Sequence, residues 1–319
     1  MEATQEFKIG SKISNWYARN GRQNLPWREN VTPYRVWISE IMLQQTQVNA
    51  AINYFDRFMA KYPDLEAIKD ASEDDIYSLW SGLGYYRRAS YIYRTKEIIH
   101  KEFSGKMPER YEDIISLPGI GKSTAGAILS IAFNRPYPIL DANVKKVISR
   151  IFYKNSFEEK SFWKLSEQIL DKKNLFMYQQ GVMDLGSQLC LPKNPKCIAC
   201  PVNKNCLSNI KGKYPVLTKK KIKRKKEYLQ FSVIKKNKKY FLTKNNALGY
   251  WKNLWMPPVT KNNFTDVDVT HNLSHRELNI SFVEIPDYNQ KIKGKWFSTH
   301  EIKNIAIPKP IFDKLIINE

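Results

Sequence analysis

The stretch LPGIGKSTAGAIL, residues 117–129, places two glycines in a short turn between two predicted helices. Gly119 and Gly121 permit a positive φ and a close approach of another backbone, and the second helix is predicted to begin just after them, near Lys122. Further along the chain, Asp141 precedes another predicted helix in PILDANVKKVISR. Free N–H groups at the start of a helix bind phosphate groups without reading base sequence. Taken alone, the turn is either a phosphate-binding turn or an ordinary helix–turn–helix corner.

The chain around this turn is predicted to be helical. Over residues 11–206 apolar residues recur at helical spacing, proline and glycine lie mostly between segments, and β-branched alternation is scarce. One long helix is predicted from the N-cap Thr32 and Pro33 to about Lys61. Further helices are predicted over residues 73–81, 85–102, 109–116, 122–133, 141–153, 161–170 and 175–186.

The composition changes after Cys206. The run KKKIKRKK, residues 219–226, is a block of like charges that predicts a solvated basic linker over residues 207–227. Beyond it the segments YLQFSVI, KYFLT and LNISFVEI alternate apolar and polar residues, as strands do. The predicted fold class is therefore multidomain, with an all-α body over residues 1–206 and a small α+β domain over residues 228–319.

Length and composition exclude several classes of protein. The chain has 319 residues, which favours two domains, and its 42% hydrophobic and 26% charged residues exclude wholesale disorder and collagen-like repeats. The longest apolar-leaning run, residues 125–133, is far shorter than the ~18 residues that cross a bilayer. The N-terminal sequence MEATQEFKIG lacks the apolar segment of a secretion signal. We therefore expect a cytoplasmic protein without a membrane partner.

Positive charge indicates the kind of partner. The formal net charge is +21 and the pI is about 9.6, which favours a polyanion such as nucleic acid. A genome biased toward Lys, Asn and Ile codons would also raise the charge. However, residues 211–244 hold 14 Lys or Arg and only one acidic residue, so most of the excess is concentrated in one stretch. This clustering favours nucleic-acid binding.

All four cysteines fall within residues 190–206, with the spacing C-x6-C-x2-C-x5-C. In a cytoplasmic protein such a group indicates a metal site rather than disulfides. Four thiolates suit either structural zinc or a [4Fe–4S] cluster, and their spacing alone does not separate the two. Because the set contains no histidine and no open position, a structural role is predicted. The ligands would be Cys190, Cys197, Cys200 and Cys206.

The turn together with Asp141 resembles the helix-hairpin-helix and Gly/Pro…Asp signature of the endonuclease III superfamily of DNA glycosylases. The cysteine spacing resembles the [4Fe–4S] ligand pattern of the same superfamily. WISEIMLQQTQV, residues 37–48, and SGLGYYRRA, residues 81–89, resemble its adenine DNA glycosylase branch. The resemblance is strong over residues 15–206. It is weaker over residues 228–319, which are similar in layout to the Nudix-like, 8-oxoguanine-recognition domain of that branch.

This resemblance implies a division of the body and a function. It implies a six-helix barrel over about residues 30–135, and an iron–sulfur part formed by the N-terminal helix and about residues 136–206. The implied activity is that of a monofunctional DNA glycosylase of base excision repair, which hydrolyses the N-glycosidic bond of adenine mispaired with 8-oxoguanine or guanine. The implied partner is double-stranded DNA that contains such a mispair. We expect a monomer that carries a [4Fe–4S] cluster and associates with the nucleoid through DNA.

Two carboxyl groups fit this chemistry. Release of adenine needs an acid to protonate the base and an anion near the oxocarbenium-like sugar. Glu40 lies roughly 60° from Trp37 around its predicted helix, at the edge of the apolar stripe, where desolvation should raise its pKa. The resemblance implies that Glu40 protonates adenine at N7 and later helps to activate water, while Asp141 stabilises the sugar cation. The plain structural alternatives are a solvated helix-edge carboxylate at Glu40 and an N-cap at Asp141.

One position bears on whether the DNA strand is also cut. Bifunctional members of the superfamily carry a lysine nucleophile in the helix after the hairpin, and the matching residue here is Ser123. Lys122 lies about 100° away around that helix and should point elsewhere. Since a hydroxyl group cannot form an imine, the expected product is an abasic site.

The resemblance also assigns residues to the DNA and to the flipped base. An adenine that leaves the duplex opens a gap, which inserted side chains fill. For Tyr85 and Trp27 ordinary core packing is the alternative. The implied set comprises Gln45, Thr46 and Tyr85 near the opposite base, Trp27, Arg28 and Gln180 near adenine, Asn143 beside Asp141, and Gly119, Gly121 and Ser123 in the hairpin.

In the second domain HNLSH, residues 271–275, resembles the F-S-H loop that contacts 8-oxoguanine, with Leu273 in place of phenylalanine. The implied contacts are Ser274 and His275. LGYWKNLWMPP, residues 248–258, resembles the G-x-W-x-x-L-x-x-F-P segment of the same domain, also with substitutions. The Nudix catalytic box is missing from the sequence, so this domain is predicted to recognise a base without hydrolysing a nucleotide.

Three other functions compete with this interpretation. An endonuclease III-like glycosylase and lyase for oxidised pyrimidines is disfavoured by Ser123, Glu40 and the additional domain. A non-catalytic iron–sulfur DNA-binding protein would use the hairpin and the basic linker only, and the presence of both Glu40 and Asp141 argues against it. A Nudix hydrolase is disfavoured by the missing box.

Overall fold

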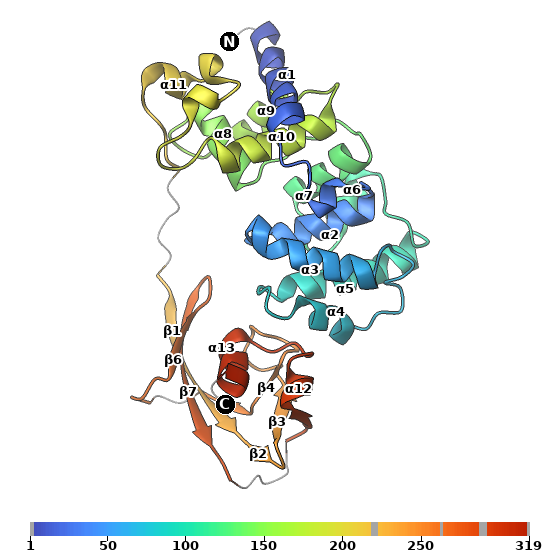
Figure 1. Cartoon of the computed structure of the whole chain (residues 1–319), viewed down its shortest axis with the longest axis vertical. Coiled ribbons are helices and arrows are strands. Elements are labelled where there is room, and N and C mark those ends of the chain that lie inside the picture. Colours follow the sequence, from blue (N-terminus) through green and yellow to red (C-terminus); the bar gives the residue numbers. More distant parts are fainter. Residues whose placement is uncertain (1–2, 218–222, 262–263, 287–291, 318–319) are drawn as a thin grey trace. The chain divides into compact units, whose positions relative to one another are not determined.

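The computed structural model describes residues 3–217, 223–261, 264–286 and 292–317, with the side chains described from Ile9 onward (Figure 1). The chain divides into two compact units. We call the first, residues 1–69 and 94–219, the body unit, and the second, residues 70–93 and 220–319, the mixed unit. The body unit contains Glu40, Asp141 and the four cysteines, and the strands described belong to the mixed unit.

The first half of the body unit is built around α2 (Pro33–Leu43). Trp37, Ile38 and Ile41 of this helix are fully buried. The side chain of Thr32 accepts a hydrogen bond from the backbone N–H of Arg35, so the predicted start of the helix is confirmed. The helix packs against α3 (Val48–Lys61), α7 (Lys122–Ala127) and the following π-helical turn η2 (Ile128–Ala132). Also present are η1 (Pro26–Arg28), α6 (Tyr111–Ser116) and, from residue 94 onward, the second part of α5 (Arg87–Glu102), whose first part belongs to the mixed unit.

The prediction of a single helix from Thr32 to Lys61 is wrong. The segment forms two helices, because α2 ends at Leu43 and α3 begins only at Val48. Gln45, between them, has a φ of +58°, and a left-handed residue cannot continue a right-handed helix. Residues 44–47 contain neither glycine nor proline, so the usual sequence signal for a break is missing. The break leaves the side chain of Gln45 exposed.

The second half of the body unit surrounds a separate core. Ile9 and Ile13 are fully buried in it, and Cys190 and Cys200 pack against its edge. The core therefore joins the N-terminal helix to the segment that carries the cysteines. The helices around it are α1 (Ala3–Asn20), α8 (Ala142–Ile151), α9 (Glu159–Gln168) and α10 (Leu175–Gln188), followed by η3 (Cys197–Ala199), η4 (Asn203–Asn205) and α11 (Leu207–Lys211) (Figure 1).

Gly126 of α7 lies against the segment that leads to Asp141. A Cβ atom at Gly126 would lie 2.2 Å from the carbonyl oxygen of Pro138, and a backbone atom cannot rotate out of the way. We expect Gly126→Ala to lower the free energy of unfolding by about 1–3 kcal/mol, measured by denaturant unfolding. Gly121→Ala is the matched control, because its φ is −93° and an added Cβ meets nothing within 4 Å. Equal stability of the two variants would contradict this close packing.

The mixed unit contains α4 (Glu73–Trp80) and two four-stranded sheets within the described residues. The first sheet has the order β5-β1-β7-β6, and its long central strands β1 (Lys225–Val233) and β7 (Arg276–Glu284) run parallel. The second has the order β2-β3-β4, and β8 pairs with β3. The remaining elements are β2 (Lys235–Lys236), β3 (Lys239–Lys244), β4 (Trp255–Met256), β5 (Val259–Thr260), β6 (Val269–Asn272), β8 (Lys295–Ser298), α12 (Thr299–Ile302), α13 (Lys309–Phe312) and η5 (Asp313–Ile317).

The predicted strands are confirmed, and the linker differs from its prediction. Alternate residues of β1, such as Leu229 and Phe231, are buried. This two-residue period is the pattern that predicted a strand there. The predicted linker over residues 207–227 includes α11 at one end and the first residues of β1 at the other. Residues 218–222, which include the first four residues of the basic run, lie outside the described residues.

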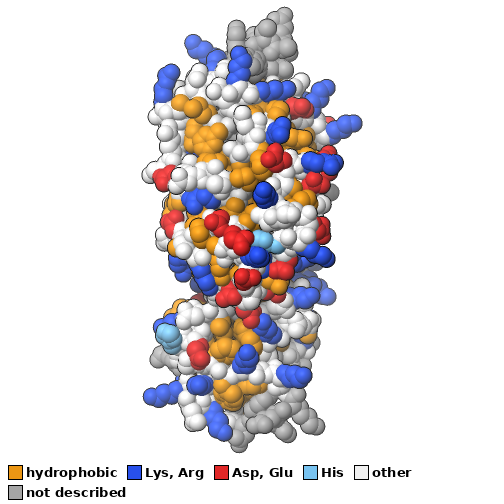
Figure 2. Space-filling view, turned by 90° about the vertical axis from the view of Figure 1, so that its right-hand side faces the viewer, with side chains coloured by type: hydrophobic (Ala, Val, Ile, Leu, Met, Phe, Trp, Pro, Cys, Tyr) orange, Lys and Arg blue, Asp and Glu red, His pale blue; other side chains and the backbone are white. Residues whose placement is uncertain are grey.

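Charged side chains of both signs are interspersed on the face that Figure 2 shows. Lys and Arg side chains do not gather into one patch on this face, and apolar side chains lie among them. Among the helices that the structure describes, none combines the length and the apolar character that crossing a membrane requires.

Candidate active site

Glu40 lies on α2 beside the fully buried side chains of Ile41 and Met42. Its own side chain keeps partial access to solvent. Burial, and to a lesser extent the nearby charge of Asp141, raise the pKa of Glu40 to about 8, while the positive charge of Arg28 acts in the opposite direction. At neutral pH Glu40 therefore holds a proton, as a general acid must.

Asp141 is the N-cap of α8, and its Oδ1 accepts a hydrogen bond from the backbone N–H of Val144 at 2.7 Å. Burial raises the pKa of Asp141, whereas the hydrogen bonds from backbone N–H groups and the charges of Lys145 and Lys146 oppose that rise. The predicted capping role is confirmed. Of the two carboxyl groups, Asp141 has these donors and cations to stabilise a negative charge.

Arg28 is held beside this pair by Asp184, a residue that the sequence analysis missed. Nη1 and Nη2 of Arg28 donate to the two carboxylate oxygens of Asp184 at 2.8 and 2.9 Å, and Arg22 donates to the same carboxylate. Burial alone would raise the pKa of Asp184, but these hydrogen bonds outweigh it and lower the pKa. The sequence does carry a signal for this ion pair, because Asp184 is the one acidic residue in the mostly apolar helix α10. A carboxylate buried in such a helix needs a cationic partner.

Trp27 and Gln180, two residues assigned to the adenine pocket, are both buried in the body unit. The ring of Trp27 packs edge-on against the ring of Phe55, with centroids 5.5 Å apart. The core-packing interpretation of Trp27 is thus confirmed, and its contact with adenine stays a prediction. Gln180 lies on α10 and is 4% exposed.

The glycine turn uses its conformational freedom at one position. Gly119 has a φ of +80°, while Gly121 has a φ of −93° and forms the N-cap of α7. The positive φ that the sequence permits at both glycines is thus present only at Gly119. Gln44 donates a hydrogen bond from Nε2 to the carbonyl oxygen of Gly119 at 3.3 Å, which connects the turn to the break after α2. At Gly121 open space faces the missing side chain.

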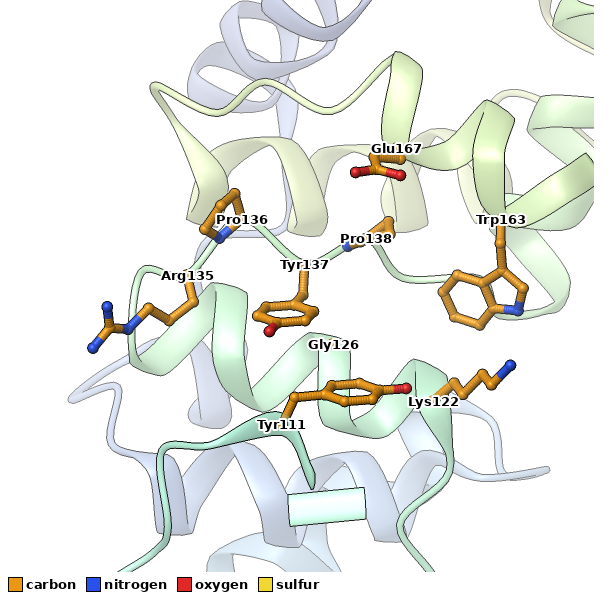
Figure 3. A pocket seen from close by; sticks show the side chains of 9 residues that line it. All are labelled: Tyr111, Lys122, Gly126, Arg135, Pro136, Tyr137, Pro138, Trp163 and Glu167. Atoms are coloured by element: carbon orange, nitrogen blue, oxygen red, sulfur yellow. The ribbon is translucent and has the colours of Figure 1, made fainter. Parts of the chain in front are cut away.

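Ser123 and Lys122 face different surroundings at the start of α7. Oγ of Ser123 accepts a hydrogen bond from the backbone N–H of Leu140 at 3.1 Å, directly before Asp141 in the chain. Lys122 instead lines a groove of about 650 Å³, together with the stacked rings of Tyr111 and Tyr137 (Figure 3). The prediction that Lys122 points away from Ser123 is therefore confirmed. Glu40 and Asp141 are not among the residues that line this groove.

The two residues predicted to enter the base stack share an unusual backbone conformation. Gln45, in the body unit, has a φ of +58°, and Tyr85, in the mixed unit, has a φ of +51°. Both side chains are exposed, that of Tyr85 to 51%. The core-packing alternative for Tyr85 is therefore wrong. Thr46 follows Gln45, is half-buried, and donates its backbone N–H to the carbonyl oxygen of Leu43.

Asn143 lies at a close contact between α8 and α10. A Cβ atom at Gly186 of α10 would lie 2.7 Å from the Cβ of Asn143, so a glycine is required there. Oδ1 of Asn143 accepts a hydrogen bond from Nζ of Lys146 at 3.4 Å. These contacts fix the first turn of α8, which Asp141 caps.

The four cysteines follow α10 and are all half-buried. Nη1 of Arg150 donates to Sγ of Cys190 at 3.4 Å, and Sγ of Cys206 donates to the carbonyl oxygen of Arg150 at 3.3 Å. Burial raises the pKa of Cys200 to about 12, and the other three cysteines contribute to the rise because their charges lie nearby. The four thiols therefore lie close enough to repel one another as thiolates.

The four thiols form a donor set that suits either structural zinc or a [4Fe–4S] cluster. Among the described residues, no three His, Cys, Asp or Glu side chains converge closely enough to hold one metal ion. The guanidinium of Arg150 provides a positive charge beside Cys190, which suits a negatively charged sulfur centre.

Ser274 and His275 lie in the tight turn between β6 and β7, and both are exposed. The turn is closed by a hydrogen bond from the backbone N–H of Leu273 to the carbonyl oxygen of Arg276. Trp251, in the segment 248–258, has a φ of +53°, and its ring centroid lies 5.6 Å from that of His271.

Comparison with known proteins identifies the family of this chain. The profile of the family described as "HhH-GPD superfamily base excision DNA repair protein" matches residues 38–170. A curated relative from Buchnera aphidicola subsp. Schizaphis graminum (strain Sg), "Adenine DNA glycosylase", is 40% identical over 94% of this chain and 95% of its own.

Solved structures give the same result for the fold. A thermostable thymine-DNA glycosylase matches 66% of this chain and 100% of its own, with a TM-score of 0.61 and 29% identity. A non-covalent endonuclease III–DNA complex matches 66% of this chain and 98% of its own, with a TM-score of 0.56 and 18% identity, and shares the fold. The fold and these matches define a base excision DNA repair glycosylase, an enzyme that hydrolyses an N-glycosidic bond. Within that class, the chain belongs to the adenine DNA glycosylase family.

Proposed function

We propose that this enzyme releases adenine from double-stranded DNA in which adenine is mispaired with 8-oxoguanine or guanine. The observation that carries the proposal is the pairing of Glu40, whose pKa is raised to about 8, with the nearby Asp141. The first supplies a proton at neutral pH and the second has donors that stabilise its negative charge. The resemblance of residues 37–48 and 81–89 to the adenine-specific branch supports adenine as the base.

The two groups divide the chemistry between them. As the bond between adenine and the sugar breaks, its electron pair moves to the base, and the carboxyl proton of Glu40 passes to N7 of adenine. The Asp141 carboxylate stabilises the positive charge that develops on the sugar. Water then adds to the sugar carbon, and its proton returns to the Glu40 carboxylate. Arg28, Trp27 and Gln180 are proposed to lie near adenine during these steps, and Asn143 is proposed to act beside Asp141.

The product is an abasic site with an intact strand. Ser123 occupies the position of the lysine nucleophile in bifunctional relatives, and its hydroxyl group is engaged with the backbone N–H of Leu140. Lys122 lines the groove of Figure 3 rather than the side of the helix that carries Ser123. A covalent imine therefore has no amine at the required position.

DNA is held by the hairpin and opened by inserted side chains. Backbone N–H groups at the start of α7, after Gly119 and Gly121, are proposed to bind a backbone phosphate. Gln45, Thr46 and Tyr85 are proposed to fill the gap that the flipped adenine leaves. The sheets of the mixed unit are proposed to form a Nudix-like domain in which Ser274 and His275 contact 8-oxoguanine, which the exposed turn between β6 and β7 supports.

Cys190, Cys197, Cys200 and Cys206 are proposed to bind a structural [4Fe–4S] cluster. We expect the purified protein to be brown and to contain four iron atoms per chain with inorganic sulfide. Cys197→Ala should give unstable or insoluble protein, because the cluster closes the segment that packs against the α1–α10 core. Iron and zinc analysis checks this, and one zinc ion per chain in a colourless protein would contradict it.

The pH dependence of the rate follows from Glu40. Because the protonated carboxyl is the active form and the pKa is raised to about 8, we expect the single-turnover rate to fall as the pH rises through about 8. An ordinary glutamic acid, ionised above about 4.3, would already be inactive at neutral pH. The measurement is the rate of adenine release between pH 5.5 and 10 with saturating enzyme, and a rate that stays constant up to pH 10 would contradict this role of Glu40.

A base-release assay tests the function as a whole. Three duplexes are compared, with adenine opposite 8-oxoguanine, adenine opposite guanine, and an oxidised pyrimidine. We expect adenine to be released from the first two, and the strand to break only after alkali is added. Release of the oxidised pyrimidine, or strand cleavage without alkali, would instead assign the enzyme to the bifunctional endonuclease III-like class.

A further inference from the structure

Tyr85 holds a conformation that its own side chain disfavours. Its φ is +51°, in the left-handed region where a residue with a Cβ atom is strained. Burial of the ring does not hold Tyr85 in this conformation, because the side chain is 51% exposed. Neighbouring residues must therefore hold the backbone of Tyr85 in this conformation.

Arg88 provides these contacts from the first turn of α5. Its Nη2 donates to the carbonyl oxygen of Gly84 at 2.9 Å, and its Nε donates to the carbonyl oxygen of Tyr85 at 3.4 Å. The guanidinium also lies 5.5 Å from the centroid of the Tyr85 ring. One side chain thus holds both the backbone and the ring of Tyr85.

Trp80 supports Arg88 from the other side. Trp80 is fully buried, its Nε1–H donates to the carbonyl oxygen of Gly84 at 3.1 Å, and the Arg88 guanidinium lies 5.2 Å from its ring. Arg88 itself is only 4% exposed. Burial lowers the pKa of Arg88 to about 10, so it keeps its charge at neutral pH. A buried arginine directed at two carbonyl oxygens is unsuited to contact a phosphate.

We propose that Arg88 is a positioning residue for base flipping, which locks Tyr85 in its left-handed conformation and so presents the exposed ring for insertion into DNA. The inference rests on the proposed function, in which Tyr85 fills the gap in the duplex. Arg88 acts through Tyr85 and does not touch the substrate. Its loss should therefore slow base flipping without changing the chemistry at Glu40 and Asp141.

The experiment compares variants of the full-length, cluster-containing enzyme under single-turnover conditions. The readouts are the rate of adenine release opposite 8-oxoguanine and the fluorescence of 2-aminopurine placed beside the mispair, which reports unstacking. The variants are Arg88→Met, Arg88→Lys, Tyr85→Ala and the double variant Tyr85→Ala/Arg88→Met. Arg87→Met is the matched control, because Arg87 is the adjacent, exposed arginine and its guanidinium lies over Tyr91 instead.

We expect Arg88→Met to reduce the release rate and the rate of the fluorescence change by about 10-fold, the equivalent of 1.4 kcal/mol. Arg88→Lys keeps the charge but not the forked pair of donors, so it should show a smaller loss in both. Arg87→Met should change neither rate when the enzyme is saturating. The double variant should match Tyr85→Ala, because Arg88 has then nothing left to position.

Each contrary outcome has a distinct meaning. If the two losses multiply in the double variant, Arg88 supports something other than Tyr85 and the inference is overturned. The same holds if Arg88→Met and Arg88→Lys both retain the wild-type fluorescence kinetics. If Tyr85→Ala alone changes neither readout, the role of Tyr85 in the proposed function is wrong instead. A general loss of stability caused by Arg88→Met would also lower the rate of the double variant below that of Tyr85→Ala. The comparison of these two variants therefore separates loss of stability from loss of Tyr85 positioning.

Discussion

Glu40→Gln should lower the single-turnover rate of adenine release by about 10²–10⁴-fold, because it removes the proton donor. Glutamine is close in size to the protonated glutamic acid that the raised pKa of about 8 implies, so it should leave the packing beside Ile41 and Met42 intact. The amide cannot transfer a proton to adenine and cannot later accept one from water. Affinity for the mispaired duplex should therefore stay near the wild-type value.

The measurement is adenine release under single turnover, with affinity obtained by titrating a duplex that carries a non-cleavable adenine analogue. Glu29→Gln is the matched control, because Glu29 is an exposed glutamate just after η1 and should tolerate the change. The remaining activity of Glu40→Gln should no longer fall as the pH rises through about 8. A near-normal rate in Glu40→Gln would mean that another group protonates the base.

Much of the helical architecture could be predicted from the sequence, because each helix carries its own local signals. The cap at Thr32, the proline after it and the apolar spacing of α2 are all local, and the structure confirms the start of that helix. The same spacing placed Glu40 at the edge of a buried stripe, and its raised pKa agrees with that position. Local chemistry was enough here because a helix fixes which residues share a face.

The parts that could not be predicted depend on contacts between distant residues. Gln45 takes a left-handed conformation without a glycine or proline nearby, and the hydrogen bond from Gln44 to Gly119 comes from a segment far away in sequence. The pairing of Arg28 with Asp184 likewise joins two ends of the body unit. Propensity and periodicity describe neighbours along the chain, so they are silent about both.

The sequence also could not separate one helix from two between Thr32 and Lys61. The apolar spacing continues through the break, since Val48 and Phe55 both fit the period that begins with Trp37. In the structure Trp37 and Phe55 are fully buried, whereas Val48 is only half-buried. The polar residues 44–47 separate the two helices without interrupting that spacing, and the exposed Gln45 among them belongs to the proposed DNA contact.

Asp141→Asn should lower the rate of adenine release by about 10²–10³-fold, the size expected when one group that stabilises a developing charge is lost. Asparagine can still cap α8, because its side-chain oxygen can accept the hydrogen bond from the backbone N–H of Val144. The fold should therefore stay intact while the negative charge opposite the sugar cation disappears. Single-turnover release and thermal unfolding measure the two properties separately, and Asp56→Asn, an exposed position on α3, is the matched control.

The same variant tests whether the two carboxyl groups interact. The charge of Asp141 helps to raise the pKa of Glu40, so its removal should lower that pKa. Because the protonated form of Glu40 is the active one, the residual rate of Asp141→Asn should begin to fall at a lower pH than the wild-type rate does. A smaller rate with an unchanged pH profile would mean that Asp141 does not act on Glu40 through its charge. An unchanged rate would remove Asp141 from the reaction and leave it only as the cap of α8.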